Sequence, residues 1–174
     1  MIQLVKRAQK GDIDAFAELM QLCKQDMYRV ARSYLQSDAD IADAMQDTIL
    51  ACFESLPTLR TPAYFKTWLL RILINKCNDT LRGSRKYVSI ETLPEEGIHD
   101  QAIANAEFDM LMDSLDEQYR TVLVLRYGEG LSVRQISQIL EISESAVKQR
   151  LKRGRDKARG LFEPPNQIRM EVVI

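Results

Sequence analysis

The chain has 174 residues, of which 45% are hydrophobic and 28% charged, and its formal net charge is −1. No run reaches the ~18 consecutive apolar residues that cross a bilayer, and the first residues, MIQLVKRAQKGD, lack the apolar core of a signal peptide. We therefore expect a cytoplasmic protein that does not insert into membranes. The single histidine, His99, and three widely spaced cysteines do not have zinc-site spacing, so we expect buried reduced thiols, no metal and no cofactor.

Charge is distributed unevenly along the chain. Residues 89–113 contain seven acidic residues and no basic residue, whereas the parts on either side carry a slight excess of basic residues. Pro94 and Gly97 fall in the same acidic stretch, where the helical periodicity is weak. This pattern predicts two modules joined by a flexible acidic linker. The expected boundaries are 1–86 for the first module, 87–106 for the linker, 107–163 for the second module and 164–174 for a tail.

Apolar residues recur at a helical spacing through the first module, which predicts helices rather than strands. Asp12 is the expected N-cap of a helix with Ile13, Phe16, Leu19, Met20 and Cys23 on its apolar face, and a second helical pattern covers residues 26–35. Ser37 and Asp38 begin another helix, whose expected buried face holds Ile41, Met45, Ile49, Cys52 and Phe53. After a break at Pro57, Thr61 followed by Pro62 is typical of a helix start, here of a helix to residue 85.

This last helix carries two different faces. Phe65, Leu69, Ile72 and Leu73 follow helical spacing on one side, where most of them belong in a core. A second set, the aromatic–polar stripe, consists of Tyr64, Trp68, Arg71, Asn75, Asp79 and Arg82. Aromatic rings beside cations can stack unpaired bases, although plain core packing of Trp68 would explain its presence equally well.

The second module contains two short helices joined by a tight turn. Ser114 with Glu117 has the spacing of a capping box before residues 119–127, and Gly128–Gly130 form a turn. Ser132 with Gln135 makes a second capping box before residues 133–140, and Ser143 caps the helix that follows. Two helices connected in this way match the helix-turn-helix plan.

The second helix of this motif begins the run SESAVKQRLKRGRDKARGLF, which has seven basic and two acidic residues. A solvated surface helix would show the same charge, so the apolar spacing is the more informative feature. Ile136, Ile139, Leu140, Ile142, Val147 and Leu151 point inward and fix one helix across the other. The outward set is cationic or amide-bearing and suits phosphates and base edges: Lys148, Gln149, Lys152, Arg153 and Arg155. Ser143 and Ser145 at the helix start can bind phosphates, and Gly154 permits close approach of DNA or of another helix.

Three segments, residues 38–53, 64–82 and 115–159, resemble the two domains of extracytoplasmic-function sigma factors of bacterial RNA polymerase. The resemblance covers residues 10–86 and 107–162 in the family's order. It implies an all-α fold of two small helical domains, the C-terminal one with a helix-turn-helix. It also implies an alternative sigma factor that binds core RNA polymerase and promoter DNA, acts in a stress response and is restrained by an anti-sigma factor, which in this family is often tethered to the membrane.

The resemblance also implies roles for individual residues. Asp43, Gln46 and Asp47 match the helix that grips core polymerase. Arg60 lies in the loop that receives a flipped base, Tyr64, Phe65 and Trp68 match the segment that opens the duplex, and Arg71, Asn75, Asp79 and Arg82 complete the −10 set. Lys148, Gln149 and Arg153 match the positions that face the −35 element. With residues singled out from the helix-turn-helix itself, the expected −35 set is Ser132, Ser143, Ser145, Lys148, Gln149, Lys152 and Arg153.

This sequence departs from the family pattern at four positions. Ala42 and Ile49 replace a common Glu and Phe, and Ser137 and Glu141 replace a common Ala and Gly, which predicts a less tight turn in the helix-turn-helix. Two other functions remain compatible with the residues alone: an autonomous, dimeric helix-turn-helix regulator, and a helical adaptor without a DNA role. No phosphate-binding loop or histidine-based dyad is visible, so we do not expect an enzyme.

Overall fold

The computed structural model describes residues 1–86 and 112–162, and within these ranges the regular structure is entirely helical. This confirms the all-α fold class. The proposed linker, 87–106, and tail, 164–174, both lie wholly outside the described residues, so the domain boundaries stay a prediction.

Four helices form the N-terminal half and three the C-terminal half of the described chain. The first set is α1 (Ile2–Ala8), α2 (Ile13–Arg32), α3 (Asp38–Ser55) and α4 (Phe65–Lys86), with the 3₁₀ turns η1 (Leu56–Thr58) and η2 (Pro62–Tyr64) before α4. The second set is α6 (Glu117–Leu123), extended by the π-helical turn η3 (Val124–Gly128), then α7 (Val133–Leu140) and α8 (Glu144–Phe162). The pattern over residues 26–35 is not a separate helix but continues α2.

Most of the expected helix starts are confirmed. Asp12 Oδ1 accepts a hydrogen bond from the Ala15 amide at 2.9 Å, and Ser37 Oγ accepts one from Asp40 at 3.3 Å. Ser132 and Gln135 form both bonds of a capping box. The capping box expected at Ser114 is wrong, because α6 begins at Glu117 with Asp116 as its N-cap.

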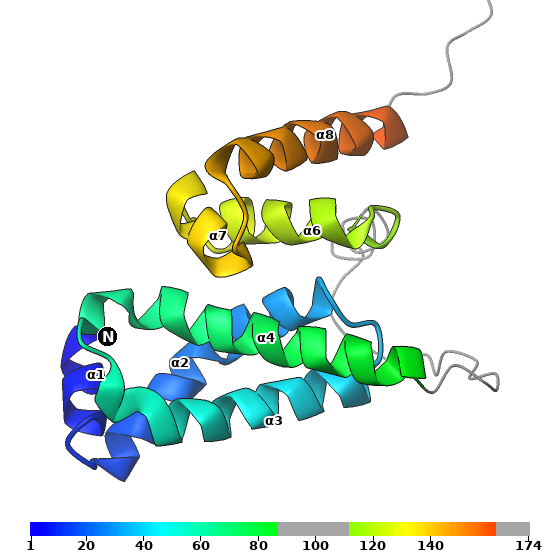
Figure 1. Cartoon of the computed structure of the whole chain (residues 1–174). Helices are drawn as coiled ribbons and strands as arrows, with labels where there is room; N and C mark the ends of the chain where they lie inside the picture. The colour runs from blue at the N-terminus through cyan, green and yellow to red at the C-terminus, as the bar shows by residue number, and fades with distance from the viewer. Residues whose placement is uncertain (87–111, 163–174) are drawn as a thin grey trace, which may run out of the picture.

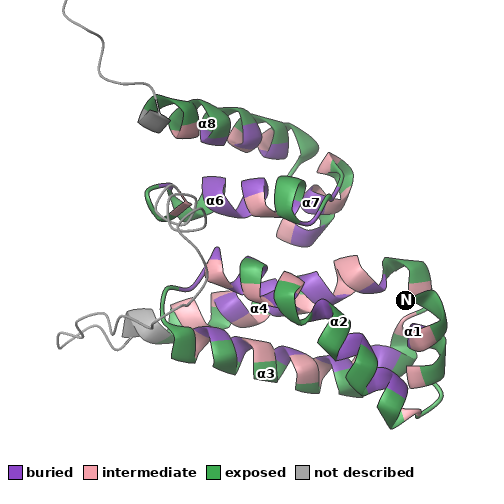
Figure 2. Ribbon diagram, turned by 180° about the vertical axis from the view of Figure 1, so that it is seen from behind, coloured by how far each residue is buried: buried purple, intermediate pink, exposed green. Residues whose placement is uncertain are grey.

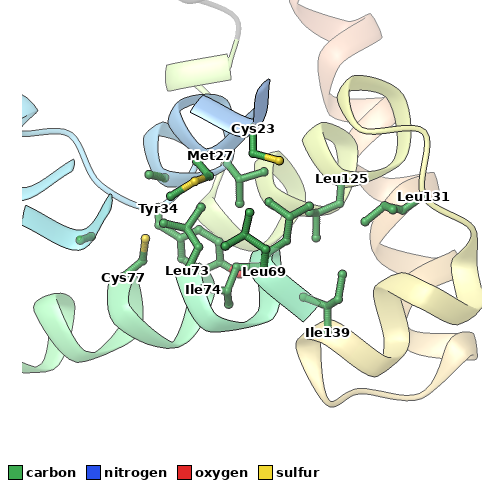
Figure 3. Close-up of a cluster of buried hydrophobic side chains, with 14 of the residues drawn as sticks. Cys23, Met27, Tyr34, Leu69, Leu73, Ile74, Cys77, Leu125, Leu131 and Ile139 are labelled. Atoms are coloured by element: carbon green, nitrogen blue, oxygen red, sulfur yellow. The ribbon is translucent and has the colours of Figure 1, made fainter. Parts of the chain in front are cut away.

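The helices lie in two layers (Figure 1). Helices α2, α3 and α4 pack together in one layer, and α6 and α7 each pack against α8 in the other. The layers meet where α7 contacts α4 and η3 contacts α2. Figure 3 shows buried side chains at this meeting place, and Leu69 and Leu73 of α4 belong to the same apolar cluster as Leu125, Leu131 and Ile139.

Two predicted core residues lie outside the core. Ile13 is 70% exposed and Phe53 is 55% exposed. On α3 the buried residues are Ile41, Ala44, Thr48 and Cys52, whereas Met45 and Ile49 are only partly buried. The helix is thus rotated so that small side chains at 44 and 48 face its neighbours, which lets the helices approach closely.

The three cysteines are buried free thiols, as expected from their apolar surroundings. Burial raises the pKa of Cys23 to about 11 and the pKa values of Cys52 and Cys77 to about 12. A thiol with a raised pKa holds little thiolate at neutral pH and reacts slowly.

Gly154 lets α8 pack closely against α6. A Cβ added at this position would lie 3.3 Å from Tyr119 Cβ and 3.2 Å from Leu123 Cδ1. Of the two partners considered from the sequence, the structure therefore shows a helix in close approach to Gly154.

We expect Gly154→Val to lower the free energy of unfolding by about 1–3 kcal/mol, because the larger side chain overfills this contact. Gly160→Val is the matched control on the same helix, since a Cβ there meets nothing within 4 Å. Urea unfolding followed by circular dichroism measures both, and equal losses in the two variants would contradict the packing role of Gly154.

Candidate nucleic-acid and protein interfaces

The outward face of α8 carries the expected basic residues. Lys148, Gln149, Lys152 and Arg153 are exposed, whereas Val147 and Leu151 are buried against the rest of the motif. Figure 2 shows this exposed side of α8 turned away from the other helices. The face is therefore free to meet a polyanion without disturbing the core.

The three serines of the −35 set differ in what their hydroxyls do. Ser143 Oγ caps α8 by accepting from the Ala146 amide at 3.1 Å, and Ser145 is exposed. The Ser132 hydroxyl donates to Gln135 Oε1 at 2.9 Å within the capping box. Ser132 is thus the least available of the three for a phosphate.

The aromatic–polar stripe lies along α4 and the turn before it. Tyr64, Arg71, Asn75, Asp79 and Arg82 are exposed, as is Arg60 in the loop between η1 and η2. Trp68 is partly buried against the core, so its ring contributes to packing and still borders the surface.

One residue of the −10 set does not belong to the surface. Phe65 is fully buried, so it contributes to the core in this structure, and its part in opening the duplex stays a prediction. Its ring centroid lies 6.0 Å from that of Trp68. Phe65 therefore lies near the tryptophan on the core-facing side of the helix, as its helical spacing predicts.

Helix α7 lies over the N-terminal end of this stripe and leaves a groove there. The groove has a volume of about 710 Å³, and its walls come from both halves of the chain. Tyr64, Thr67, Trp68 and Arg71 line one side, and Arg134, Gln135 and Gln138 line the other. Gln135 Nε2 donates to Thr67 Oγ1 at 3.4 Å, which joins the two walls. No spacing within the sequence signals this contact.

Helix α3 presents a separate face on the opposite side of the molecule from α8 (Figures 1 and 2). Asp43, Gln46 and Asp47 are all exposed on it. The same side of the helix continues into Leu50 and Phe53, which are 58% and 55% exposed. These five residues form the α3 contact face.

Sequence reasoning missed the apolar part of the α3 contact face. Leu50 follows Asp43 by seven residues and Asp47 by three, so helical spacing alone could have placed it there. Large apolar side chains that lie exposed next to one another are typical of a protein-binding surface.

No helix in the described ranges has both the length and the apolar character that a bilayer crossing requires. Within the same ranges, His, Cys, Asp and Glu side chains do not gather in groups of three or more that could hold a metal ion.

The sequence matches two family models in chain order. Residues 19–87 match Sigma-70 region 2, and residues 105–157 match Sigma-70 region 4. The chain is 31% identical over 136 residues to RNA polymerase sigma factor SigV of Bacillus subtilis (strain 168), covering 75% of this chain and 80% of SigV. The chain belongs to the extracytoplasmic-function sigma factors. The resemblance of the three segments is thereby confirmed.

Two further relatives extend the similarity over nearly the whole chain. The ECF sigma factor SigW of the same organism is 28% identical over 173 residues, covering 89% of this chain and 92% of SigW. The solved structure of CnrH in complex with the cytosolic domain of CnrY is 27% identical, with a TM-score of 0.68, and covers 92% of this chain and 95% of CnrH. An ECF sigma factor is a transcription initiation factor of RNA polymerase that acts on promoter DNA, and the family is not one of enzymes.

Proposed function

We propose that this sigma factor uses three separate surfaces, one for core RNA polymerase and one for each of two promoter elements. The α3 contact face binds core RNA polymerase, the aromatic–polar stripe with Arg60 engages and helps to open the −10 region, and the outward face of α8 engages the −35 element. The observation that carries the proposal is the placement of the α3 and α8 faces on opposite sides of the molecule (Figure 1). Polymerase and promoter can therefore be held at the same time.

The chemistry of each surface suits its partner. Polymerase binding requires a protein interface, and the α3 contact face combines acids with exposed Leu50 and Phe53. The α8 face presents Lys148, Lys152 and Arg153, whose charges suit phosphates and guanine edges in the major groove. The chain supplies promoter selection and strand opening in the cytoplasm, and the polymerase supplies the chemistry.

An anti-sigma factor is part of the same proposal. CnrH was solved in complex with the cytosolic domain of another protein, CnrY. A comparable partner of this chain would cover the α3 contact face, because exposed Leu50 and Phe53 offer it an apolar anchor. A stress signal that releases this partner would then free the sigma factor for polymerase.

Run-off transcription with purified core polymerase on genomic fragments tests the function. We expect promoter-dependent transcripts only when the protein is added, together with co-elution of the protein and core polymerase. An autonomous regulator would instead bind a palindromic duplex tightly on its own, and a helical adaptor would retain its function after the charges of Lys148 and Arg153 are removed. Absence of both transcript and co-elution would overturn the proposal.

Trp68→Ala is expected to slow open-complex formation by about tenfold or more, because stacking of one unpaired base contributes ~1–3 kcal/mol. Closed-complex binding should change by less than about threefold, since duplex contacts lie elsewhere. Permanganate reactivity of unpaired thymines measures opening, and Trp68→Phe is the control that keeps an aromatic ring. An equal fall in both steps together with lower thermal stability would show that Trp68 only packs the core.

A further inference from the structure

The ion pairs described between the two halves of the chain all join a cation of the N-terminal half to a carboxylate of the C-terminal half. Four cations of the N-terminal half pair with three carboxylates of the C-terminal half: Arg29 and Lys66 with Glu129, Arg32 with Asp113, and Arg71 with Glu141. The acids thus lie where a polyanion would meet the cations of α2 and α4.

Glu129 is the centre of this set. It follows η3, and its side chain is 0% exposed. Its Oε1 lies 3.1 Å from Arg29 Nη2, its Oε2 lies 2.9 Å from Lys66 Nζ, and Asp26 pairs with the same two cations. Burial by itself lowers the pKa of Lys66, but its pairing with the carboxylates of Asp26 and Glu129 raises the pKa overall. A buried carboxylate is tolerated only when it is paired, so Glu129 depends on the N-terminal half.

Apolar packing holds the same two surfaces together. Leu69 and Leu73 on α4 share one cluster with Leu125, Leu131 and Ile139 from the C-terminal half (Figure 3). All five side chains are nearly fully buried. Separating the halves would expose part of this surface to water, which is unfavourable.

Glu141 makes a contact that the glycine common at this position in the family could not make, because glycine has no side chain. It ends α7 with φ of +56°, in the left-handed region that favours glycine. The resemblance leads one to expect Gly at this turn. A non-glycine residue in this conformation is disfavoured, yet its carboxylate pairs with Arg71 of the aromatic–polar stripe. Glycine would relieve the backbone and leave Arg71 without this acid.

We propose that the free protein holds itself closed, with Glu129 occupying Arg29 and Lys66 and Glu141 occupying Arg71 in place of promoter DNA. Of these cations, Arg71 lines the groove together with Trp68. This inference rests on the proposed function of the stripe. The α3 contact face and the α8 face stay exposed in the closed form, so polymerase can bind before the halves separate. Separation of α7 from α4 is then the step that admits the −10 strand.

A disulfide across the closed contact gives the sharpest test. Thr67→Cys with Gln135→Cys replaces two side chains that already touch, and the three native thiols are buried. After oxidation we expect run-off transcription to fall by at least about tenfold while co-elution with core polymerase persists. Reduction should restore the transcript, and Thr67→Cys alone under the same oxidant is the control.

The outcomes of this experiment separate the two proposals. Full transcription by the cross-linked protein would overturn the closed form as an inhibited state. Failure of the wild-type protein and the reduced variant alike would overturn the sigma-factor roles of the surfaces instead.

The converse test opens the contact in the free protein without polymerase. Glu129→Gln with Glu141→Asn removes both charges, and Asn tolerates the left-handed turn. Trp68 is the only tryptophan, so its emission reports on the groove directly. We expect a red shift and about tenfold tighter binding of a single-stranded DNA 12-mer, because more molecules are open.

Glu144→Gln is the matched control, since Glu144 is exposed at the start of α8, away from the groove. Glu141→Asn alone should show a smaller change in the same direction, which keeps the test valid if the double variant is poorly folded. Unchanged emission and unchanged DNA binding in a folded double variant would overturn the proposal.

Discussion

Leu50→Arg is expected to weaken the complex with core RNA polymerase by about 100-fold, because loss of a central apolar anchor in a protein interface costs ~2–4 kcal/mol. Leu50 is 58% exposed in the free protein, so the substitution leaves the core of the helical layer intact. Asp47 and Asp43 lie one and two turns earlier on the same face, and the new guanidinium would also neutralise them. Titration of labelled protein with core polymerase measures the dissociation constant.

Leu22→Arg is the matched control for this experiment. Leu22 on α2 is exposed to a similar degree but lies outside the α3 contact face. We expect its polymerase affinity and its thermal midpoint to match the wild type. Equal weakening by both variants would show that the α3 contact face is not the polymerase site.

Lys148→Ala combined with Arg153→Ala is expected to reduce transcription from a −35-dependent promoter by about 100-fold or more. Each lost phosphate or base contact costs ~1–3 kcal/mol, and the two side chains lie on one exposed face. Polymerase binding should be unchanged, since α3 lies on the opposite side (Figure 1). Run-off transcription at increasing salt measures both the loss and a shallower salt dependence.

Arg159→Ala tests whether charge alone explains this effect. Arg159 is exposed on the same helix, further from the helix-turn-helix. Its loss is expected to change transcription by less than about threefold. If Arg159→Ala has the same effect as the double variant, α8 attracts DNA without a defined reading face.

Features that depend on neighbouring residues were predicted well from the sequence. The caps at Asp12, Ser37, Ser132 and Ser143 form as expected because each uses a backbone amide three residues along the chain. The buried side chains of the helix-turn-helix, such as Ile136 and Val147, also follow the predicted spacing. The predicted start of α6 was wrong, since the helix begins at Glu117 with Asp116 rather than Ser114 at the N-cap position.

Features that depend on the neighbouring helix were predicted less well. The rotation of α3 places Phe53 outside and Thr48 inside, since close helix packing favours small side chains at the contact. Phe65 is fully buried near Trp68, as its spacing on the apolar side of the helix predicts, although the family resemblance matches it to the segment that opens the duplex. Hydrophobic spacing defines a broad apolar stripe, and only packing decides which residues at its edges are covered.

By itself, the sequence determined the helices and the helix-turn-helix, because these follow from local hydrogen bonds and from short-range apolar periodicity. The family was indicated by the resemblance of three segments, not by periodicity. Only the tertiary structure decided how the two halves meet. Arg29 and Glu129 are 100 residues apart in the chain, and Arg71 and Glu141 are 70 apart. Such pairs leave no periodic signal, since their proximity arises from the packing of Leu69 and Leu73 against the C-terminal helices. In the sequence, Glu141 is only a departure from the glycine common in the family. The structure shows that its carboxylate pairs with Arg71 of the other half.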